Sequence, residues 1–455
     1  MHYDLVLKNG TLVTPAESIN ADIAVSGGKI AYIGKIEDCN AASEVYDAEG
    51  KHILSGIIDA HVHFRDPGLT EKEDFETGSM AAAFGGITTI VDMPNVLPPT
   101  STLDRFNEKV SIAKEKSCVD FALFALLPND NLLSENISQL ESLKKAGALG
   151  FKVFLGTSTG DIAAPCAGVL YEQMEKCASL GMRIGFHAET DEINRHFTSL
   201  CKKETGTPDG HVLSRARPVF SEVLAVNNAV CYAQYTGAKI HIHHVTSLDA
   251  SLIVARAKEK GIDITSETCP HYLLLDADTN CHKVYPPIRG EKHRRGVWDA
   301  LKSGTIDMIA SDHAPHTAYE KKLPLWESAA GLCGVETFVP LMLNEVNRGN
   351  LSLNDFVRAA SETPAKIWGI YPRKGSLLCG ADGDFTVVDM NKKQKISVDN
   401  LHSKSKTSPF DGIEIQGTPV AAIVRGKFVV KDGRFTGKKG FGEFVKKDGF
   451  VSPAL

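Results

Sequence analysis

Eight short apolar runs, rich in β-branched residues, alternate with amphipathic or alanine-rich stretches between about residue 58 and residue 315. The runs lie at 56–64, 86–94, 119–128, 149–156, 182–189, 239–247, 263–270 and 307–315. Hydrophobicity in these runs is continuous rather than alternating, which is typical of strands that are covered on both faces. The stretches between the runs predict crossover helices, the clearest at 101–117, 132–146, 168–180 and 219–235.

Eight successive β/α units favour an α/β fold of the (β/α)8 TIM-barrel type. The alternative is an open, doubly wound sheet, which usually carries a glycine-rich phosphate loop directly after its first strand. Here the first run leads into HVHFRDPG, which does not match the pattern G-x-G-x-x-G. The pattern therefore predicts the closed barrel.

The two ends of the chain follow a different pattern, with short alternating strands and tight turns. Asn-Gly and Gly-Gly dipeptides mark turns in residues 2–54, and an Asp-Gly dipeptide marks one in residues 382–435. Each end alone has little to bury, so we expect the two ends to pair into one small β-sandwich. The polar tail at 438–449 is expected to form an arm or a disordered end.

A length of 455 residues would allow up to three domains, but a barrel and one sandwich built from both ends make two. The predicted division assigns residues 1–55 plus 376–455 to the β-sandwich and residues 56–375 to the barrel.

Composition excludes several classes of protein. With 43% hydrophobic and 23% charged residues, the chain is neither disordered, collagen-like nor disulfide-dense. A net charge of −6 without a basic block argues against a nucleic-acid partner. No run approaches the roughly 18 apolar residues of a membrane span, and the charged N-terminus lacks a signal-peptide core, so we expect a cytoplasmic protein. The ten cysteines are scattered and are expected to be reduced.

Potential metal ligands gather at the ends of the predicted strands. His61 and His63 stand two residues apart, so on a strand both imidazoles project to one face. The other strand ends carry Lys152, His187, His243 or His244, and Asp312. Because barrel enzymes place their sites at the carboxyl ends of the strands, this set predicts a metal centre at the barrel mouth.

Lys152 needs a separate argument, because an ammonium group cannot bind a cation. Burial among Phe151, Val153 and Phe154 would lower its pKa and leave a neutral amine able to capture CO₂. The resulting carbamate is a two-oxygen anion that can bridge two divalent ions. The alternative is an ordinary lysine at a strand end, neutralised by an acid.

Several motifs resemble those of the cyclic amidohydrolases, within the amidohydrolase superfamily: DAHVHFRDPG, VDMPN, GFKVFLGTSTG, GFHAE, HVTS, ETCPHYL and IASDHAPHT. HFRDPG together with DHAPHT most resembles the dihydroorotases in that group, and the likeness covers nearly the whole chain. The resemblance implies a hydrolase with two divalent ions, most commonly Zn²⁺. It would interconvert N-carbamoyl-L-aspartate and dihydroorotate in pyrimidine biosynthesis.

The resemblance also implies a role for each ligand. The more buried ion would be held by His61 and His63, and the more exposed ion by His187 and His244. A CO₂-derived carbamate on Lys152 would bridge the two ions, and Asp312 would ligate the first ion and act as general base and acid.

His244 is preferred to His243 as the ligand, because the family's histidine immediately precedes an apolar residue and a Thr/Ser pair. His241 and His243 would then be packing or surface residues.

Substrate choice depends on a few further positions. A ring that carries a carboxylate calls for a guanidinium, and Arg65 is on the same strand phase as the two histidines before it. By the resemblance, Asn95 and His316 match the other carboxylate-binding positions of dihydroorotases. The alternative role for Arg65 is a salt bridge to Asp66 or Glu73.

Tyr285 departs from the dihydroorotase pattern, which commonly has asparagine at this position near the ring. Ala330 and Gly331 are expected to offer backbone groups to the ring, with a purely structural turn as the alternative.

Two alternative functions stay open. An allantoinase or a hydantoinase of the dihydropyrimidinase type would keep the metal chemistry and take rings without the carboxylate. A non-catalytic scaffold with an amidohydrolase fold is the other. By the resemblance, the enzyme would be a homodimer or homotetramer that acts on a small cyclic amide.

Overall fold

A computed structural model describes residues 2–447, except 38–41, 129–132, 157–161, 205–208 and 281. Most of the predicted GTSTG motif at 156–160 therefore lies outside the described residues. All eight predicted apolar runs form strands of one ring. These strands are β8 (Ile57–Val62), β9 (Ile87–Asp92), β10 (Asp120–Leu123) with β11 (Ala125–Leu126), β12 (Phe151–Phe154), β13 (Arg183–His187), β14 (Lys239–Ile242), β15 (Ile264–Thr268) and β16 (Met308–Ile309).

The ring is parallel and closed. β10 and β11 are one strand interrupted at Phe124, whose backbone N–H donates to the carbonyl oxygen of Asp92 at 3.0 Å. Ala125 N–H donates to the carbonyl oxygen of Gly150 at 3.1 Å, so the strand passes from one neighbour to the next. The ring closes where His63 N–H donates to the carbonyl oxygen of His313 at 2.8 Å. The (β/α)8 barrel predicted from the sequence is confirmed.

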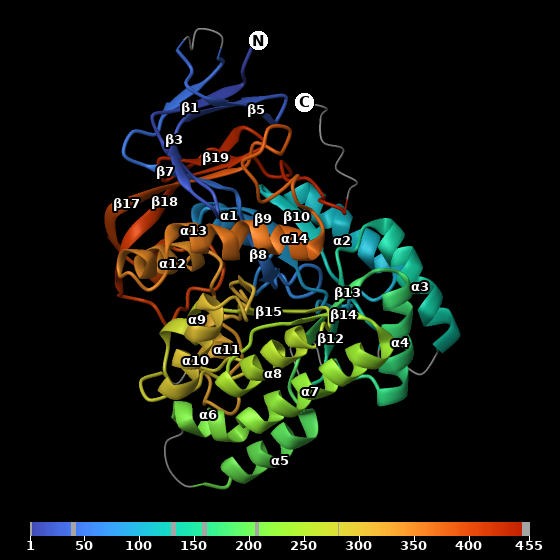
Figure 1. The fold of residues 1–455 in the computed structure, drawn as a ribbon. Coiled ribbons are helices and arrows are strands. Elements are labelled where there is room, and N and C mark those ends of the chain that lie inside the picture. Colours follow the sequence, from blue (N-terminus) through green and yellow to red (C-terminus); the bar gives the residue numbers. More distant parts are fainter. Residues whose placement is uncertain are drawn as a thin grey trace.

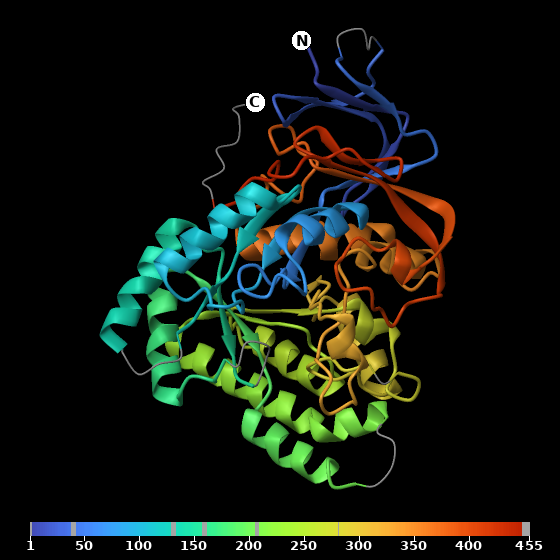
Figure 2. The same cartoon turned by 180° about the vertical axis from the view of Figure 1, so that it is seen from behind.

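Helices surround the ring (Figure 1, Figure 2). The four clearest predicted helices are present within a few residues of their expected ends, as α2 (Leu103–Lys116), α3 (Leu133–Ala146), α4 (Ala167–Ser179) and α7 (Val219–Thr236). The others are α1 (Phe75–Phe84), α5 (Asp191–Cys201), α6 (Gly210–Ala216), α8 (Leu248–Glu259), α9 (Pro270–Leu274), α10 (Glu291–Lys302), α11 (Ala318–Lys322), α12 (Phe338–Asn347), α13 (Leu353–Val357), the π-helix η1 (Arg358–Glu362) and α14 (Thr363–Trp368). Within the described part of the chain, none of these helices has the length and apolar character needed to cross a bilayer.

The two ends of the chain form two sheets at one end of the molecule, blue and red in Figure 1. One sheet has the order β5-β4-β1-β6 and the other β20-β19-β18-β17-β7-β2-β3. The strands are β1 (Leu5–Lys8), β2 (Thr11–Val13), β3 (Ser18–Asn20), β4 (Asp22–Ser26), β5 (Lys29–Gly34), β6 (Val45–Asp47), β7 (His52–Ser55), β17 (Phe385–Lys395), β18 (Glu414–Val424), β19 (Lys427–Lys431) and β20 (Arg434–Phe435), with a 3-10 turn η2 (Val398–Asn400). β7 pairs with β17 in antiparallel register, which joins the two ends in one sheet.

Apolar side chains from both ends, including Leu5, Ile23, Phe385 and Ile423, fill the space between these sheets. The β-sandwich expected from the two flanks is therefore present. The exact domain boundaries stay a prediction.

The polar tail differs from the expected arm or disordered end, as far as it is described. Phe121 N–H donates to the carbonyl oxygen of Glu443 at 3.0 Å, and Val445 N–H donates back to the carbonyl oxygen of Phe121 at 2.7 Å. Val445 is fully buried, and the ring of Phe444 stacks on Phe121 with centroids 5.6 Å apart. Two apolar residues among the charges therefore attach this segment to the barrel.

A buried ionic cluster joins the barrel to the sandwich. The Lys374 ammonium contacts Asp120 of β10, Asp384 at 2.6 Å and Asp382 at 2.9 Å, and all four side chains are buried. Removing one partner of such a cluster leaves charges buried without compensation.

Lys374→Met is expected to destabilise the protein by about 3–5 kcal/mol, because buried Asp384 loses its cation. Asp120, in contrast, keeps Arg425, and Asp382 keeps Lys29 and Arg373. Denaturant unfolding measures this loss, and Lys427→Met at an exposed position is the matched control. A loss below about 1 kcal/mol for Lys374→Met would show that the cluster is not a major source of stability.

Candidate active site

A cavity of about 260 Å³ opens beyond the carboxyl ends of the barrel strands. Every site residue predicted from the sequence lines it: His61, His63, Arg65, Asn95, Lys152, His187, His244, Tyr285, Asp312, His316, Ala330 and Gly331. The opposite part of the barrel interior is filled by apolar side chains around the fully buried Trp368. The candidate site residues therefore lie together at one end of the barrel.

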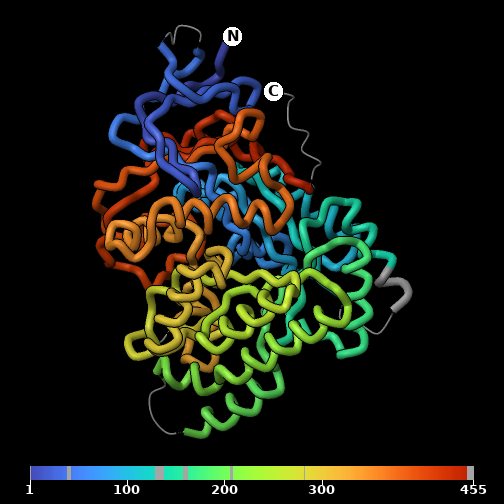
Figure 3. Tube along the Cα trace, viewed as in Figure 1, coloured from blue at the N-terminus to red at the C-terminus, as the bar shows by residue number. Residues whose placement is uncertain are grey.

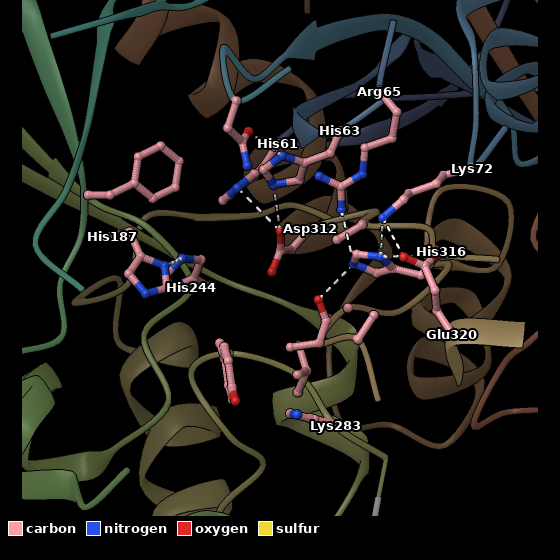
Figure 4. Close-up of a pocket in the computed structure, with 18 of the residues that line it drawn as sticks. His61, His63, Arg65, Lys72, His187, His244, Lys283, Asp312, His316 and Glu320 are labelled. Carbon is pink, nitrogen blue, oxygen red and sulfur yellow. Dashed lines mark hydrogen bonds and ion pairs between the residues drawn. The ribbon is translucent and has the colours of Figure 1, made fainter. Parts of the chain in front are cut away.

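Two of the histidines converge on one carboxylate (Figure 4). Asp312 Oδ1 lies 3.3 Å from His61 Nε2 and 3.2 Å from His63 Nε2. Burial lowers the pKa of both histidines well below its usual value, so both rings are neutral and offer lone pairs. Two neutral imidazoles and a carboxylate within this distance form a candidate site for a divalent ion.

A second pair of histidines lies beside the first, with the ring centroids of His61 and His244 5.5 Å apart. His187 Nδ1 is 2.9 Å from His244 Nε2, and His187 Nε2–H donates to Glu189 Oε2 at 3.0 Å. Glu189 in turn accepts hydrogen bonds from Arg217 at 2.9 and 2.5 Å. The bond to Glu189 directs the free lone pair of His187 toward His244, as an outer-sphere carboxylate does for a metal-binding histidine.

Two groups orient the first two histidines: Glu267, which was not predicted, and Asn95, which was predicted as a carboxylate-binding residue. The Glu267 carboxylate accepts from His61 Nδ1, from His243 Nδ1 at 2.9 Å and from His241 Nε2 at 3.1 Å. His241 and His243 are thus buried packing residues, and the surface alternative for them is wrong. His63 Nδ1–H donates to Asn95 Oδ1 at 2.7 Å, which leaves its Nε2 lone pair free.

Lys152 lies fully buried between these groups, and its Nζ has no hydrogen-bond partner among the described residues. The buried ammonium groups of Lys109 and Lys374 differ, because each is paired with carboxylates. Burial lowers the pKa of Lys152 to about 7, so a substantial share of the amine is neutral near neutral pH. An unpartnered, readily deprotonated amine amid this donor set fits the carbamate bridge of a metal pair.

The other end of the cavity is cationic. Arg65 is buried, and its Nη1 has no hydrogen-bond partner in the described part of the chain. Lys72 donates to Glu320 at 2.6 Å and to His316 Nδ1 at 3.3 Å, while His316 Nε2–H donates to the carbonyl oxygen of Ala330 at 3.0 Å. Lys72 and Glu320 carry no motif of their own and were not predicted.

Arg65 does not form either of the alternative salt bridges. Asp66 pairs with Lys116 at 2.7 Å, and Glu73 bonds Thr77 and Ser403. Arg65 was expected to continue the strand, with its side chain on the same face as His61 and His63. This expectation is wrong, because β8 ends at residue 62 and Arg65 has a φ of 63°. This left-handed conformation turns the guanidinium toward the cavity, where Nη2 lies 3.4 Å from His316 Nε2.

The loop at Ala330 and Gly331 is already engaged in hydrogen bonds. Gly331 N–H donates to the carbonyl oxygen of Lys283 at 3.0 Å, and the Ala330 carbonyl oxygen accepts from His316. A Cβ at position 331 would lie 2.2 Å from the carbonyl oxygen of Ala314, so glycine is required. These contacts favour the structural turn over ring recognition by these groups.

Comparisons with known proteins give a consistent result. A family model described as "Amidohydrolase family" matches residues 52–429. The L-hydantoinase of Paenarthrobacter aurescens is 36% identical over 98% of this chain and 98% of its own length. The allantoinase of Deinococcus radiodurans is 36% identical over 96% of this chain and 97% of its own length. The solved L-hydantoinase (dihydropyrimidinase) from Arthrobacter aurescens covers 98% of this chain and 100% of its own, with 35% identity and a TM-score of 0.93.

Proposed function

This chain belongs to the amidohydrolase family, and on that premise we propose that it opens a small cyclic amide of the hydantoin or allantoin kind with two divalent ions. The observation that carries the proposal is the buried, unpartnered Lys152 amine among four neutral histidines and one aspartate. The cyclic-amidohydrolase prediction is confirmed at the level of the family. The narrower resemblance to dihydroorotases is not, because the relatives described above are named hydantoinase and allantoinase.

The residues that would hold the ions are His61, His63, His187, His244, Asp312 and a carbamate on Lys152. Divalent ions in this set, most simply Zn²⁺, would supply an activated water and polarise the carbonyl of the ring. The chain's own part is to keep the imidazoles neutral and oriented through Glu267, Asn95 and Glu189.

Asp312 is the group that moves protons in this proposal. Its carboxylate lies between the first histidine pair and the open cavity, and burial raises its pKa. It would accept a proton from the attacking water and deliver it to the ring nitrogen as the C–N bond breaks. The same atoms in reverse order would close the ring.

Dihydroorotate is retained as a second candidate because of Arg65. A buried guanidinium with an unused N–H group suits a ring substituent that bears a carboxylate. Hydantoin and allantoin carry no such group. The homodimer or homotetramer expected from the resemblance stays a prediction.

A substrate panel tests the proposal. Hydantoin, allantoin, dihydrouracil and dihydroorotate are assayed with added Zn²⁺ and bicarbonate. The proposal expects turnover of at least one uncharged ring. Turnover of dihydroorotate alone would favour the second candidate, and no turnover together with less than one bound divalent ion per chain would favour the scaffold.

Arg65→Met separates the two candidates further. If a carboxylate is bound by Arg65, kcat/KM for dihydroorotate is expected to fall about 100-fold, because charged hydrogen bonds are lost. The value for hydantoin should change much less. Arg434→Met, at an exposed position of β20, is the matched control. An equal loss for both substrates would remove carboxylate recognition from the role of Arg65.

A further inference from the structure

Tyr285 separates the candidate active site from a second hollow. Its side chain lines both the cavity of about 260 Å³ and an adjoining hollow of about 550 Å³. The second hollow is otherwise lined mainly by residues on α5, among them Asn194 and Thr198, and by Lys202 directly after the helix. Helix α5 lies at the end of the molecule opposite the sandwich, as the green part of the tube in Figure 3 shows.

The phenol ring of Tyr285 is held in place from one face. The guanidinium carbon of Arg217 lies 3.6 Å from the ring centroid, a distance typical of a cation–π contact. Arg217 is itself buried and is held by two hydrogen bonds to Glu189. Glu189 also accepts a hydrogen bond from His187, so the same buried carboxylate holds both Arg217, which packs on Tyr285, and a candidate metal ligand.

The cavity on the active-site side of Tyr285 is small. At about 260 Å³ it falls below the range of roughly 300–1,000 Å³ that is usual for pockets that hold drug-sized ligands. It has room for a five- or six-membered ring with a short substituent. Among the residues that line the two hollows, Tyr285 is the one that they share.

We propose that Tyr285 is a specificity-determining residue that restricts the substrate to rings with small substituents. This inference rests on the proposed function and narrows its substrate class. Tyr285 acts by its size. Its phenol ring occupies the space through which a large substituent on the substrate would extend toward α5. The Arg217 contact keeps the ring from swinging aside.

The test compares hydantoin with 5-benzylhydantoin. The unmodified enzyme is expected to show at least about tenfold lower kcat/KM for the benzyl compound. Tyr285→Ala should raise the ratio of benzyl to unsubstituted kcat/KM about tenfold or more, and Tyr285→Leu should raise it by less. Tyr285→Phe should leave the ratio unchanged, because the ring is kept. Tyr235→Ala, at a tyrosine that is 73% exposed, is the matched control, and thermal unfolding verifies that each variant is folded.

The outcomes separate this inference from the proposed function. If the unmodified enzyme opens none of the rings in the panel, the proposed function fails. If the unmodified enzyme opens hydantoin and 5-benzylhydantoin with equal kcat/KM, Tyr285 does not restrict the substrate, whether or not the variants fold. If it discriminates but neither folded smaller variant gains, or if Tyr285→Phe reproduces the gain, bulk at residue 285 is not the cause.

Discussion

Replacing Lys152 by methionine is expected to lower kcat/KM for the best ring substrate by about a thousandfold or more. Methionine has a similar length but cannot form a carbamate, so the anion proposed to hold the two ions could not form. The fold should not suffer, because the Lys152 amine makes no hydrogen bond in the described structure and its burial opposes its charge. The free energy of unfolding of the metal-free protein should therefore stay equal or rise.

Lys109→Met provides the matched control for this prediction. Lys109 is equally buried, but its ammonium pairs with Asp92 at 2.5 Å and donates to the carbonyl oxygen of Met93 at 2.6 Å. Its loss should destabilise the protein by about 3–5 kcal/mol, since the Asp92 carboxylate is left buried without its cation and keeps, among the described residues, only the hydrogen bond from Phe64 N–H. Steady-state kinetics and denaturant unfolding on both variants give the comparison. A Lys152→Met enzyme with more than a tenth of the original kcat/KM would refute the bridging role.

Asp312→Asn is expected to lower kcat by about 10²–10⁴-fold, the usual contribution of a general acid–base group. The carboxamide keeps the shape of the side chain but cannot carry the proton to the ring nitrogen. KM should change far less than kcat, because Asp312 lies beside the histidines and not at the cationic end of the cavity.

Asp249→Asn, at a partly exposed position on α8, is the control for loss of a carboxylate. Measuring kcat and metal content on the same samples distinguishes a lost proton carrier from a lost ligand. A kcat within about tenfold of the original, with full metal content, would assign the proton transfer to another group.

The barrel could be predicted from sequence because its strands are buried on both faces. The runs are therefore predominantly apolar without a regular alternation, as in residues 86–94 and 149–156. The interruption between β10 and β11 at Phe124 could not be predicted from the sequence, because a one-residue interruption keeps the same apolar composition. The docking of Val445 was missed for the opposite reason, since isolated apolar residues in a charged tail show no period.

The candidate site was predictable where ligands follow strands in a recognisable order. Their backbone conformation was not. Arg65, His244 and Asp312 all have positive φ, at 63°, 39° and 46°, and stand after the last residue of their strands. Such conformations cost energy for non-glycine residues and are often found at functional sites. They are set by the surrounding packing, which periodicity does not reveal.

The supporting groups were not predictable because they act through other side chains. Glu267 lies in the motif ETCPHYL and Glu189 in the motif GFHAE, but neither motif shows that Glu267 bonds three histidines and that Glu189 bonds one. The role of Tyr285 could be predicted only in part. Its departure from the dihydroorotase pattern was visible in the sequence, but its position between two hollows required the structure.

A zinc titration of the stripped enzyme tests the central claim most directly. The protein is freed of metal with a chelator, returned to bicarbonate buffer and titrated with Zn²⁺, while turnover of the best ring substrate and bound zinc are measured on each sample. Turnover is predicted to be absent at the start and to rise to a plateau at two bound ions per chain. Full turnover by the metal-free protein, or none with two ions bound on any ring in the panel, would contradict the assignment of this cavity as a metal-dependent cyclic-amide hydrolase site.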